Sequence, residues 1–307
     1  MLAIESEVVA VVVTFNRKEL LLRCLKNIIA QTYKVRKIVV IDNASTDGSE
    51  KYIELNVQNF RSIIRWVRLK TNQGGAGGFY EGIKEASKSD NYIWLMDDDG
   101  FPDRNCLKNL LLKCDKNSFV GPVVLSDKDK KRLSFTIRRP GTRKVYKNYK
   151  ELKESCENYM LEGIVIPFNG VLLHSDIIKR FGLPRKEYFI WGDDMEFMWR
   201  LRKGHVKIST NLNSFFYHPI SAQSEKMFFG LLYFNNTNSD LKLYCMARNT
   251  TRNLLDYRGR IFALLYLMKL IWFFSFTAPN VRKLKLTLLA FYHGLTANFA
   301  YTQKFIR

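Results

Sequence analysis

The first hundred residues alternate between short apolar runs and helical patterns. Residues 8–14 form a continuous run rich in valine, and residues 17–31 then repeat apolar side chains at helical spacing. Further strand-like runs follow at 37–41, 63–69 and 92–96. Runs that are apolar on both faces are typical of strands buried in a parallel sheet. Strands alternating with helices predict an α/β fold in which right-handed crossovers bring four strand ends to one edge of the sheet.

Three consecutive aspartates, Asp97, Asp98 and Asp99, end the fourth of these strands, and Gly100 and Pro102 follow. Ligands of open α/β sheets bind at the carboxyl ends of the strands. Adjacent carboxylates repel one another, and a divalent cation with oxygen ligands relieves that repulsion. If the strand stays extended, Asp97 and Asp99 share a face and Asp98 points away. The triplet therefore indicates either a metal site or an acidic surface turn that caps the next helix.

A glycine-rich segment over 74–78 follows the third strand, and we predict it as a loop before a helix over 79–87. It lacks the G-x-G-x-x-G spacing of dinucleotide-binding loops, so a nicotinamide cofactor is not indicated. Glycines at this place either let a ligand approach the backbone closely or form a turn.

A second acidic cluster, Asp193, Asp194 and Glu196, follows Trp191 at the start of a predicted helix over 193–203. With Asp193 as the N-cap, Glu196 stands three residues later, and the pair predicts a capping box. Asp194 then has no structural task. Burial would raise its pKa, whereas the helix amino terminus or a metal would lower it, so its role depends on geometry that the sequence does not give.

Charge and cysteine content limit the class of protein. The 307 residues carry 49 Lys and Arg against 29 Asp and Glu, a net charge of +20 that favours phosphate-bearing partners. The sequence has no Walker lysine motif and no recognisable nucleic-acid module, so a nucleic-acid-binding protein is the weaker hypothesis. A basic stretch over 128–153 is either a solvated face or an anion-binding arm. Five cysteines without a CxxC pair, and a start without an export signal, predict a cytoplasmic protein without zinc or disulfides.

Residues 221–307 differ in composition, with 12 Lys and Arg against 3 Asp and Glu between long apolar segments. The 18 residues at 261–278 are slightly short for a membrane span of about 20 and carry Lys269 near their middle. A charge there costs roughly 2.5–3.5 kcal/mol in a bilayer. Helices lying in the headgroup region of an anionic membrane fit this pattern better than a transmembrane anchor. The alternative is a helical cap packed on the main domain or on a second copy of the chain.

Together these segments resemble family 2 glycosyltransferases of the GT-A fold, over about residues 8–218. Five segments occur in the order seen in that family: 11–17, 41–48, 72–79, 97–99 and 191–196. The likeness is greatest to the galactofuranosyltransferase and rhamnosyltransferase branch. It implies a Rossmann-like nucleotide-sugar domain with a mostly parallel sheet over 1–220. The resemblance does not extend to residues 221–307, for which the composition predicts a basic helical region.

The resemblance also implies ligands for a metal and a nucleotide. Asp97, Asp99 and His218 would bind Mn²⁺ or Mg²⁺, although a lone histidine after an apolar run is more often a hydrogen-bonded core residue. The residues that would bind the nucleotide-sugar are Thr14, Arg17, Asp42, Asn72, Gly74, Gly75, Asp98 and Trp191.

The implied reaction is an inverting, metal-dependent sugar transfer. Asp194 would be the general base. Asp193 is the alternative, because Gly192 departs from the family pattern by separating Trp191 from the two carboxylates. The donor would be UDP-galactofuranose or dTDP-rhamnose, and the acceptor a glycan or polyprenyl-diphosphate-linked glycan of the cell surface.

We therefore expect a peripheral protein on the anionic inner face of the plasma membrane, as a monomer or homo-oligomer that binds no nucleic acid. A scaffold with the same fold but without activity is the remaining hypothesis.

Overall fold

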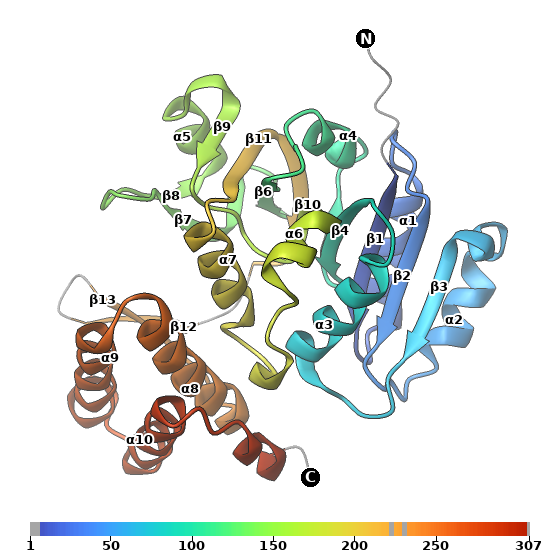
Figure 1. Ribbon diagram of the computed structural model, residues 1–307. Coiled ribbons are helices and arrows are strands. Elements are labelled where there is room, and N and C mark those ends of the chain that lie inside the picture. The colour runs from blue at the N-terminus through green and yellow to red at the C-terminus, as the bar shows by residue number, and fades with distance from the viewer. Residues whose placement is uncertain (1–6, 221–223, 229–231, 306–307) are drawn as a thin grey trace. The chain divides into compact units, whose positions relative to one another are not determined.

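The computed structural model describes residues 7–220, 224–228 and 232–305 (Figure 1). By its contacts the chain falls into two units. The larger unit comprises the chain up to Gln73, Gly78–Leu183 and a segment that begins at Leu201. The smaller unit comprises Gly74–Gly77, Pro184–Arg200 and the C-terminal region. The predicted domain boundary at residue 220 stays a prediction.

The first part of the sheet is parallel, as predicted. Its strands are β1 (Val8–Thr14), β2 (Lys37–Asp42), β3 (Ile64–Arg68) and β4 (Tyr92–Asp97), in the order β3-β2-β1-β4. The connecting helices are α1 (Lys18–Ile29), α2 (Ser49–Asn56) and α3 (Gly74–Ala86), with a 3₁₀ turn η1 (Gln58–Ile63) before β3. β1 is buried along its whole length because its valines face a covered layer on both sides of the sheet.

Beyond β4 the sheet becomes mixed. β10 (Asn169–His174) lies antiparallel between β4 and β6 (Ser118–Ser126), and β11 (Lys207–His218) runs parallel to β6. The remaining strands are β5 (Phe101–Pro102), β7 (Arg132–Arg138), β8 (Val145–Asn148) and β9 (Met160–Glu162). The helices of this part are α4 (Cys106–Leu111), α5 (Tyr149–Glu154) and α6 (Ser175–Phe181), with a 3₁₀ turn η2 (Glu157–Tyr159). The predicted α/β fold with a mostly parallel sheet is confirmed.

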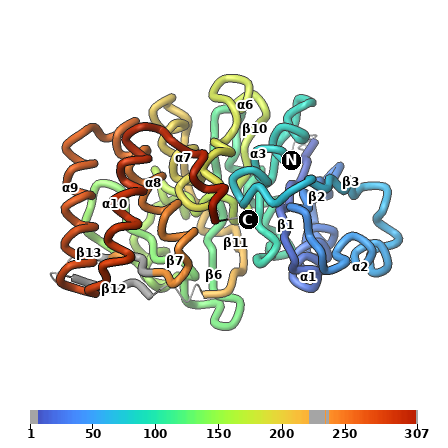
Figure 2. The backbone as a smooth tube through the Cα atoms, turned by 90° about the horizontal axis from the view of Figure 1, so that it is seen from below, coloured from blue at the N-terminus to red at the C-terminus, as the bar shows by residue number. Residues whose placement is uncertain are grey.

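The smaller unit is mainly helical. Its elements are η3 (Lys186–Tyr188), most of α7 (Asp193–Lys203), the hairpin β12 (Ser224–Phe228) and β13 (Leu232–Asn236), α8 (Asp240–Tyr257), α9 (Arg260–Trp272), the π-turn η4 (Phe273–Thr277), α10 (Val281–Leu295) and η5 (Ala300–Phe305). Figure 2 shows α8, α9 and α10 side by side. Leu243, Tyr244, Leu270 and Phe273 are buried in the core between them. The helical C-terminal region is therefore present, as predicted.

The predicted start of one helix is wrong. The glycine-rich segment is not a loop, because α3 begins at Gly74. Glycine disfavours a helix by only about 1 kcal/mol per residue, and tertiary packing can override such a preference. The basic stretch over 128–153 forms β7, β8 and α5.

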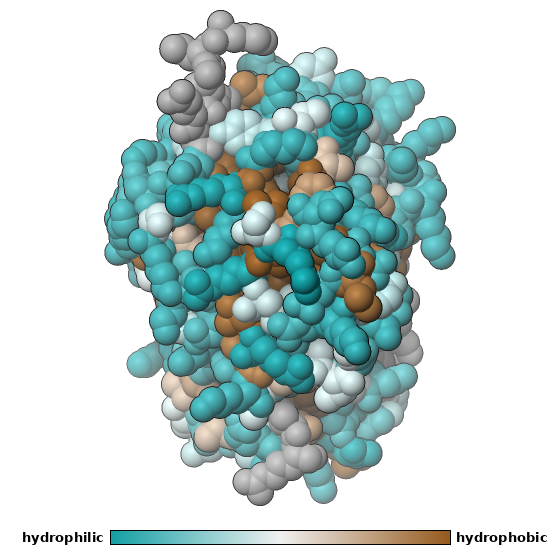
Figure 3. All heavy atoms as spheres, turned by 90° about the vertical axis from the view of Figure 1, so that its right-hand side faces the viewer, coloured by the Kyte–Doolittle hydropathy of each residue, from teal (hydrophilic) through white to brown (hydrophobic). Residues whose placement is uncertain are grey.

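The face shown in Figure 3, on the side of β3 and α2, is mainly hydrophilic, in keeping with the high charge of the chain.

Candidate active site

Three strand ends bring predicted site residues to one edge of the larger unit. Thr14 ends β1 and pairs in register with Asp42, which ends β2. Val13 pairs with Asp97 at the end of β4. Because these strands are parallel, their carboxyl ends share the edge at which ligands of α/β sheets bind.

Asp98 lies inside this edge, and its carboxylate is held on both sides. Thr14 Oγ1 donates a hydrogen bond to Asp98 Oδ2 at 2.6 Å, and Arg17 Nη1 donates to Asp98 Oδ1 at 3.2 Å. Burial raises the pKa of Asp98 to about 6, against the lowering effects of Thr14 and Arg17. β4 ends at Asp97, so the predicted strand alternation does not extend to Asp98 and Asp99, which lie in a turn. Asp98 is nevertheless the most buried of the three aspartates.

Asp99 joins the turn to β11. Arg17 Nη1 donates to Asp99 Oδ2 at 2.9 Å, and His218 Nε2 lies 3.1 Å from Asp99 Oδ1. The pKa of Asp99 lies below its ordinary value: burial raises it, but the hydrogen bond and charge of His218, and then Arg17, lower it more. The structure thus brings two of the three predicted metal ligands, Asp99 and His218, into direct contact. The third, Asp97, ends the preceding strand, where its backbone N–H donates to Phe168 O at 3.1 Å.

Both ring nitrogens of His218 face oxygen acceptors, and this arrangement bears on whether Asp99 and His218 could bind a cation together. Nδ1 lies 2.6 Å from the carbonyl oxygen of Pro219. A carbonyl can only accept, so Nδ1 carries the proton, and a neutral ring turns the lone pair of Nε2 toward Asp99. That contact needs either a second proton on the ring or a cation between the two atoms. Their 3.1 Å separation matches the roughly 3 Å between adjacent ligands of an octahedral ion with bonds of about 2.1 Å. The donor set therefore fits Mn²⁺ or Mg²⁺.

Asp42 and Asn43 order the loop that follows β2. Asp42 is 1% exposed, and its Oδ1 accepts the Ser45 N–H at 2.8 Å. Asn43 Oδ1 accepts the Gln73 N–H at 2.8 Å, which ties this loop to the segment before α3. Asn72 lies in that same segment. The Asp42 carboxylate therefore has a structural partner in its own loop as well as its predicted place in a nucleotide pocket.

Gly74 is required by a close approach within the smaller unit. Its φ is +70°, and a Cβ at this position would lie 2.0 Å from the carbonyl oxygen of Phe189. The same oxygen accepts the N–H of Ala76 at 3.1 Å. Among the residues that the structure describes, nothing lies within 4 Å of a Cβ added at Gly75. Of the two glycines predicted at the donor site, Gly74 has a demonstrated steric role.

Asp193 and Asp194 begin α7. Asp194 Oδ1 accepts the N–H of Met195 at 2.7 Å, and Asp193 is buried. Burial raises the pKa of both carboxyls, and the negative charge of Asp194 raises that of Asp193 further. A carboxylate made more basic in this way suits proton abstraction.

The predicted capping box is absent, because Glu196 is engaged elsewhere. Gly192 supplies the first helical acceptor, with the Glu196 N–H at 2.9 Å. The Glu196 carboxylate instead accepts from Tyr257 Oη at 2.6 Å and pairs with Arg200 at 2.8 Å and Arg185 at 3.4 Å. Two arginines and the hydroxyl of Tyr257 occupy the Glu196 carboxylate, so Asp193 is left without this structural partner.

The sequence patterns pointed to none of the buried polar residues of α8. Arg248, Asn249 and Asn253 donate hydrogen bonds to carbonyl oxygens between Glu187 and Gly192, the segment that contains Trp191. The signal in the sequence is a group of polar side chains in an otherwise apolar region. Composition alone does not show which groups these side chains bond to.

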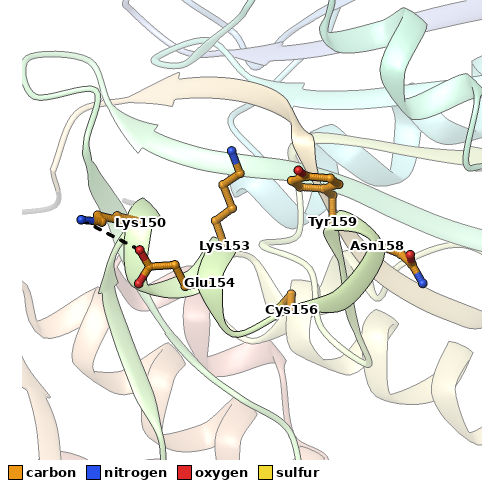
Figure 4. A pocket seen from close by; sticks show the side chains of 6 residues that line it. All are labelled: Lys150, Lys153, Glu154, Cys156, Asn158 and Tyr159. Carbon is orange, nitrogen blue, oxygen red and sulfur yellow. Dashed lines mark ion pairs between the residues drawn. The ribbon is translucent and has the colours of Figure 1, made fainter.

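Two other features lie away from these residues. In the part of the chain that the structure describes, Asp90, His174 and Asp176 bring ligand atoms within 4.8 Å of one another. Lys116 and Lys179 already pair with these carboxylates, and Asp90 precedes β4 whereas Asp97 ends it, so this group is not the predicted metal site. Figure 4 shows a hollow of about 560 Å³ between α5 and η2, lined by Lys150, Lys153, Glu154, Cys156, Asn158 and Tyr159. Lys150 pairs there with Glu154, at 3.9 Å.

Sequence comparison identifies the class of protein. The family model described as Glycosyl transferase family 2 matches residues 9–179. The galactofuranosyltransferase GlfT1 of Mycolicibacterium smegmatis is 32% identical over 231 residues, which cover 73% of this chain and 75% of that protein. GlfT1 of Mycobacterium tuberculosis (strain CDC 1551 / Oshkosh) is 32% identical over 225 residues, 72% of this chain and 73% of that protein.

Solved structures agree on the fold. A crystal structure of GalNAc-T7 with UDP, GalNAc and Mn²⁺ matches with a TM-score of 0.61 and 14% identity, over 98% of this chain and 58% of that chain. S. aureus TarS 1-349 in complex with UDP matches with a TM-score of 0.56 and 15% identity, over 96% of this chain and 83% of that chain.

The chain belongs to glycosyl transferase family 2 and has the GT-A type of fold. Within that family its similarity is to the galactofuranosyltransferases.

Proposed function

We propose that this chain transfers galactofuranose from UDP-galactofuranose to a glycan or polyprenyl-diphosphate-linked acceptor. The observation that carries the proposal is the 32% identity to galactofuranosyltransferases over about three quarters of both chains. No comparable observation favours dTDP-rhamnose, the alternative donor.

The larger unit would bind the donor. A bound Mn²⁺ or Mg²⁺ would neutralise the negative charge that grows on the leaving diphosphate. Asp97, Asp99 and His218 are the proposed ligands. Thr14 and Arg17 hold Asp98 and thereby fix the turn that carries Asp99. The side chain of Arg17 is 49% exposed, so its guanidinium is accessible to phosphate oxygens.

Asp194 is the proposed base. In the proposed reaction Asp194 Oδ2 takes the proton of an acceptor hydroxyl, because Asp194 Oδ1 is already bonded to the backbone. The acceptor oxygen forms a bond to the anomeric carbon while the bond from that carbon to the diphosphate oxygen breaks, and UDP leaves. A single displacement of this kind inverts the anomeric configuration. Asp193 is the alternative base.

We also propose that α9 lies in the headgroup region of the anionic inner leaflet, so that the protein acts at the cytoplasmic face of the membrane. α9 turns one apolar face toward the core through Ala263 and Leu270. Its other side exposes large apolar side chains: Ile261, Phe262, Leu264, Leu265, Met268, Ile271 and Trp272. Exposed apolar patches of this kind mark protein or membrane contacts.

Basic residues of the C-terminal helices favour an anionic membrane over a protein as the contact of α9. The ammonium of Lys269 lies over the Phe234 ring at 5.8 Å, so it is directed at a core residue. Arg260 begins α9 and Lys285 lies near the start of α10; both are exposed and suit anionic headgroups. The segment 260–277 is long and apolar enough to cross a bilayer, with a mean hydropathy of 1.5, and 22% of it is buried. A helix that lies in the headgroup region of a bilayer does not need to cross it.

The proposal is tested by incubating the purified chain with a polyprenyl-diphosphate-linked glycan and either UDP-galactofuranose or dTDP-rhamnose. We expect galactofuranose transfer that requires Mn²⁺ or Mg²⁺ and stops when EDTA is added. Rhamnose transfer alone would replace the donor assignment. No transfer from either donor, with metal present, would refute the proposal.

A further inference from the structure

The segment before α7 has an unusual backbone. Phe189 has φ 65° and ψ −63°, and the N–H of Ile190 donates to Tyr188 O at 2.8 Å. These values define a γ-turn of the rare, strained hand. Trp191 and Gly192 follow with φ of 61° and 92°. Bulky side chains at positive φ persist only where the surrounding structure imposes them.

Two asparagines of α8 impose this backbone. Asn249 Nδ2 lies within hydrogen-bond distance of three carbonyl oxygens of the segment, so one of its two N–H groups is shared between two of them. The three oxygens belong to Tyr188 at 3.1 Å, Ile190 at 3.1 Å and Trp191 at 2.6 Å. Asn253 Nδ2 donates to Gly192 O at 2.8 Å. Each carbonyl from Tyr188 to Gly192, apart from the Phe189 oxygen that bonds Ala76, thus accepts from α8.

The orientation of both amides is fixed by their oxygens. Asn249 Oδ1 accepts from Arg248 Nε at 2.9 Å, and Asn253 Oδ1 accepts from Tyr188 Oη at 2.7 Å. Rotating either amide by 180° would bring acceptors face to face, so the amide nitrogens must point to the segment. Asn249 is 0% exposed and Asn253 is 3% exposed. Burying polar groups is costly unless they are bonded, and a fully bonded set specifies one backbone geometry.

Gly192 adds a steric reason for the same geometry. A Cβ at this position would lie 3.1 Å from Asn249 Cβ, so α8 approaches the backbone more closely than other residues allow with ease. The glycine that interrupts the family pattern between Trp191 and Asp193 therefore stands where α8 contacts the segment.

We propose that Asn249 and Asn253 are positioning residues, which set the direction of Trp191 and of the carboxylates Asp193 and Asp194 through the backbone between them. The catalytic consequence rests on the proposed function, whereas the hold on the segment does not. The C-terminal region then supports the reaction itself in addition to any membrane contact.

The test uses the full chain with Asn253→Asp and Asn249→Asp, which keep the side-chain shape and remove the N–H donors. Thr251→Val is the matched control, because Thr251 is equally buried on α8 and its hydroxyl donates to Ala247 O of its own helix, at 2.8 Å. We expect turnover to fall by about 10²-fold, the effect of misplacing a catalytic group by about 1 Å. UDP affinity should stay unchanged, hydrogen–deuterium exchange should accelerate over 187–196, and the control should match wild type in all three measurements.

Three outcomes decide the inference. Exchange and turnover like those of wild type in both Asp variants would overturn it. Asn253→Ala, which adds no charge, should repeat the local loosening; faster exchange throughout α8 and α10 in every variant would show a general packing role and also overturn it. If wild type transfers no sugar, the proposed function fails, and exchange confined to 187–196 still supports the hold on the segment.

Discussion

Replacing Asp194 with Asn should remove most of the sugar transfer and leave the fold and donor binding intact. The Asn amide oxygen can still accept the Met195 N–H, which Asp194 Oδ1 accepts at 2.7 Å, so the start of α7 should keep its backbone. What disappears is the carboxylate that takes up the hydroxyl proton. A positioned general base contributes about 10²–10⁴ in rate. This corresponds to roughly 3–5 kcal/mol of activation free energy.

The pH dependence of turnover identifies the general base more clearly than the loss of turnover in Asp194→Asn does. A base acts when deprotonated, so turnover should rise with pH through its pKa. Burial raises the pKa of Asp193 and Asp194, which places this rise above the pH of about 4 at which an exposed aspartate titrates. Asp194→Asn also removes a negative neighbour, so the pKa of Asp193 should move down toward its ordinary value.

The assay is steady-state transfer from UDP-galactofuranose at several pH values, with UDP binding measured by calorimetry in parallel. Asp193→Asn is the matched control, since it removes the adjacent carboxylate. If Asp194→Asn keeps its turnover with the rise shifted to lower pH, and Asp193→Asn loses it, Asp193 is the base. If both variants keep wild-type turnover, the general-base reasoning is refuted.

Three further predictions follow from single features of the chain. His218→Asn should weaken Mn²⁺-dependent UDP binding by at least about tenfold, because even residues that only support metal ligands have effects of this size; calorimetry showing the same affinity as wild type would remove His218 from the metal site. Gly74→Ala should lower the free energy of unfolding by about 1–3 kcal/mol, since it adds a Cβ at φ +70° against a carbonyl oxygen. Gly75→Ala, which meets nothing within 4 Å, is its control in denaturant titration, and equal losses in the two variants would contradict the steric argument. Leu265 and Met268 are 54% and 58% exposed, so burying the exposed half of each side chain in a membrane contributes roughly 1 kcal/mol per residue. Changing both residues to Glu should therefore reduce binding to anionic vesicles by at least about 30-fold. Unchanged sedimentation of the variant with vesicles would reject α9 as the membrane contact.

Local patterns predicted the part of the fold that depends on local periodicity. The valine run of β1 and the helical spacing of α1 identify one strand–helix unit, and three repeats of this pattern determine a parallel sheet with one ligand edge. For the same reason, the ends of the apolar runs are enough to assign Asp42 and Asp97 to that edge. The contact of Asp99 with His218 joins residues 119 positions apart, and only the family resemblance suggested it.

The missed features all depend on contacts between segments far apart in the sequence. The capping box at Asp193 was locally plausible, but Arg185 and Tyr257 take up the Glu196 carboxylate. The polar residues of α8 find their partners about sixty residues upstream, so nothing near Asn249 in the sequence reveals its role. The antiparallel insertion of β10 likewise follows from sheet pairing, which a strand's own residues do not specify.

Transfer from UDP-galactofuranose to a polyprenyl-diphosphate-linked glycan, with the product analysed by NMR, tests the central claim most directly. We predict a new galactofuranosyl linkage, formed only with Mn²⁺ or Mg²⁺ present, whose anomeric configuration is opposite to that of the donor. Retained configuration would contradict the single displacement with Asp194 as base, and the absence of any galactofuranosyl product would contradict the proposed function.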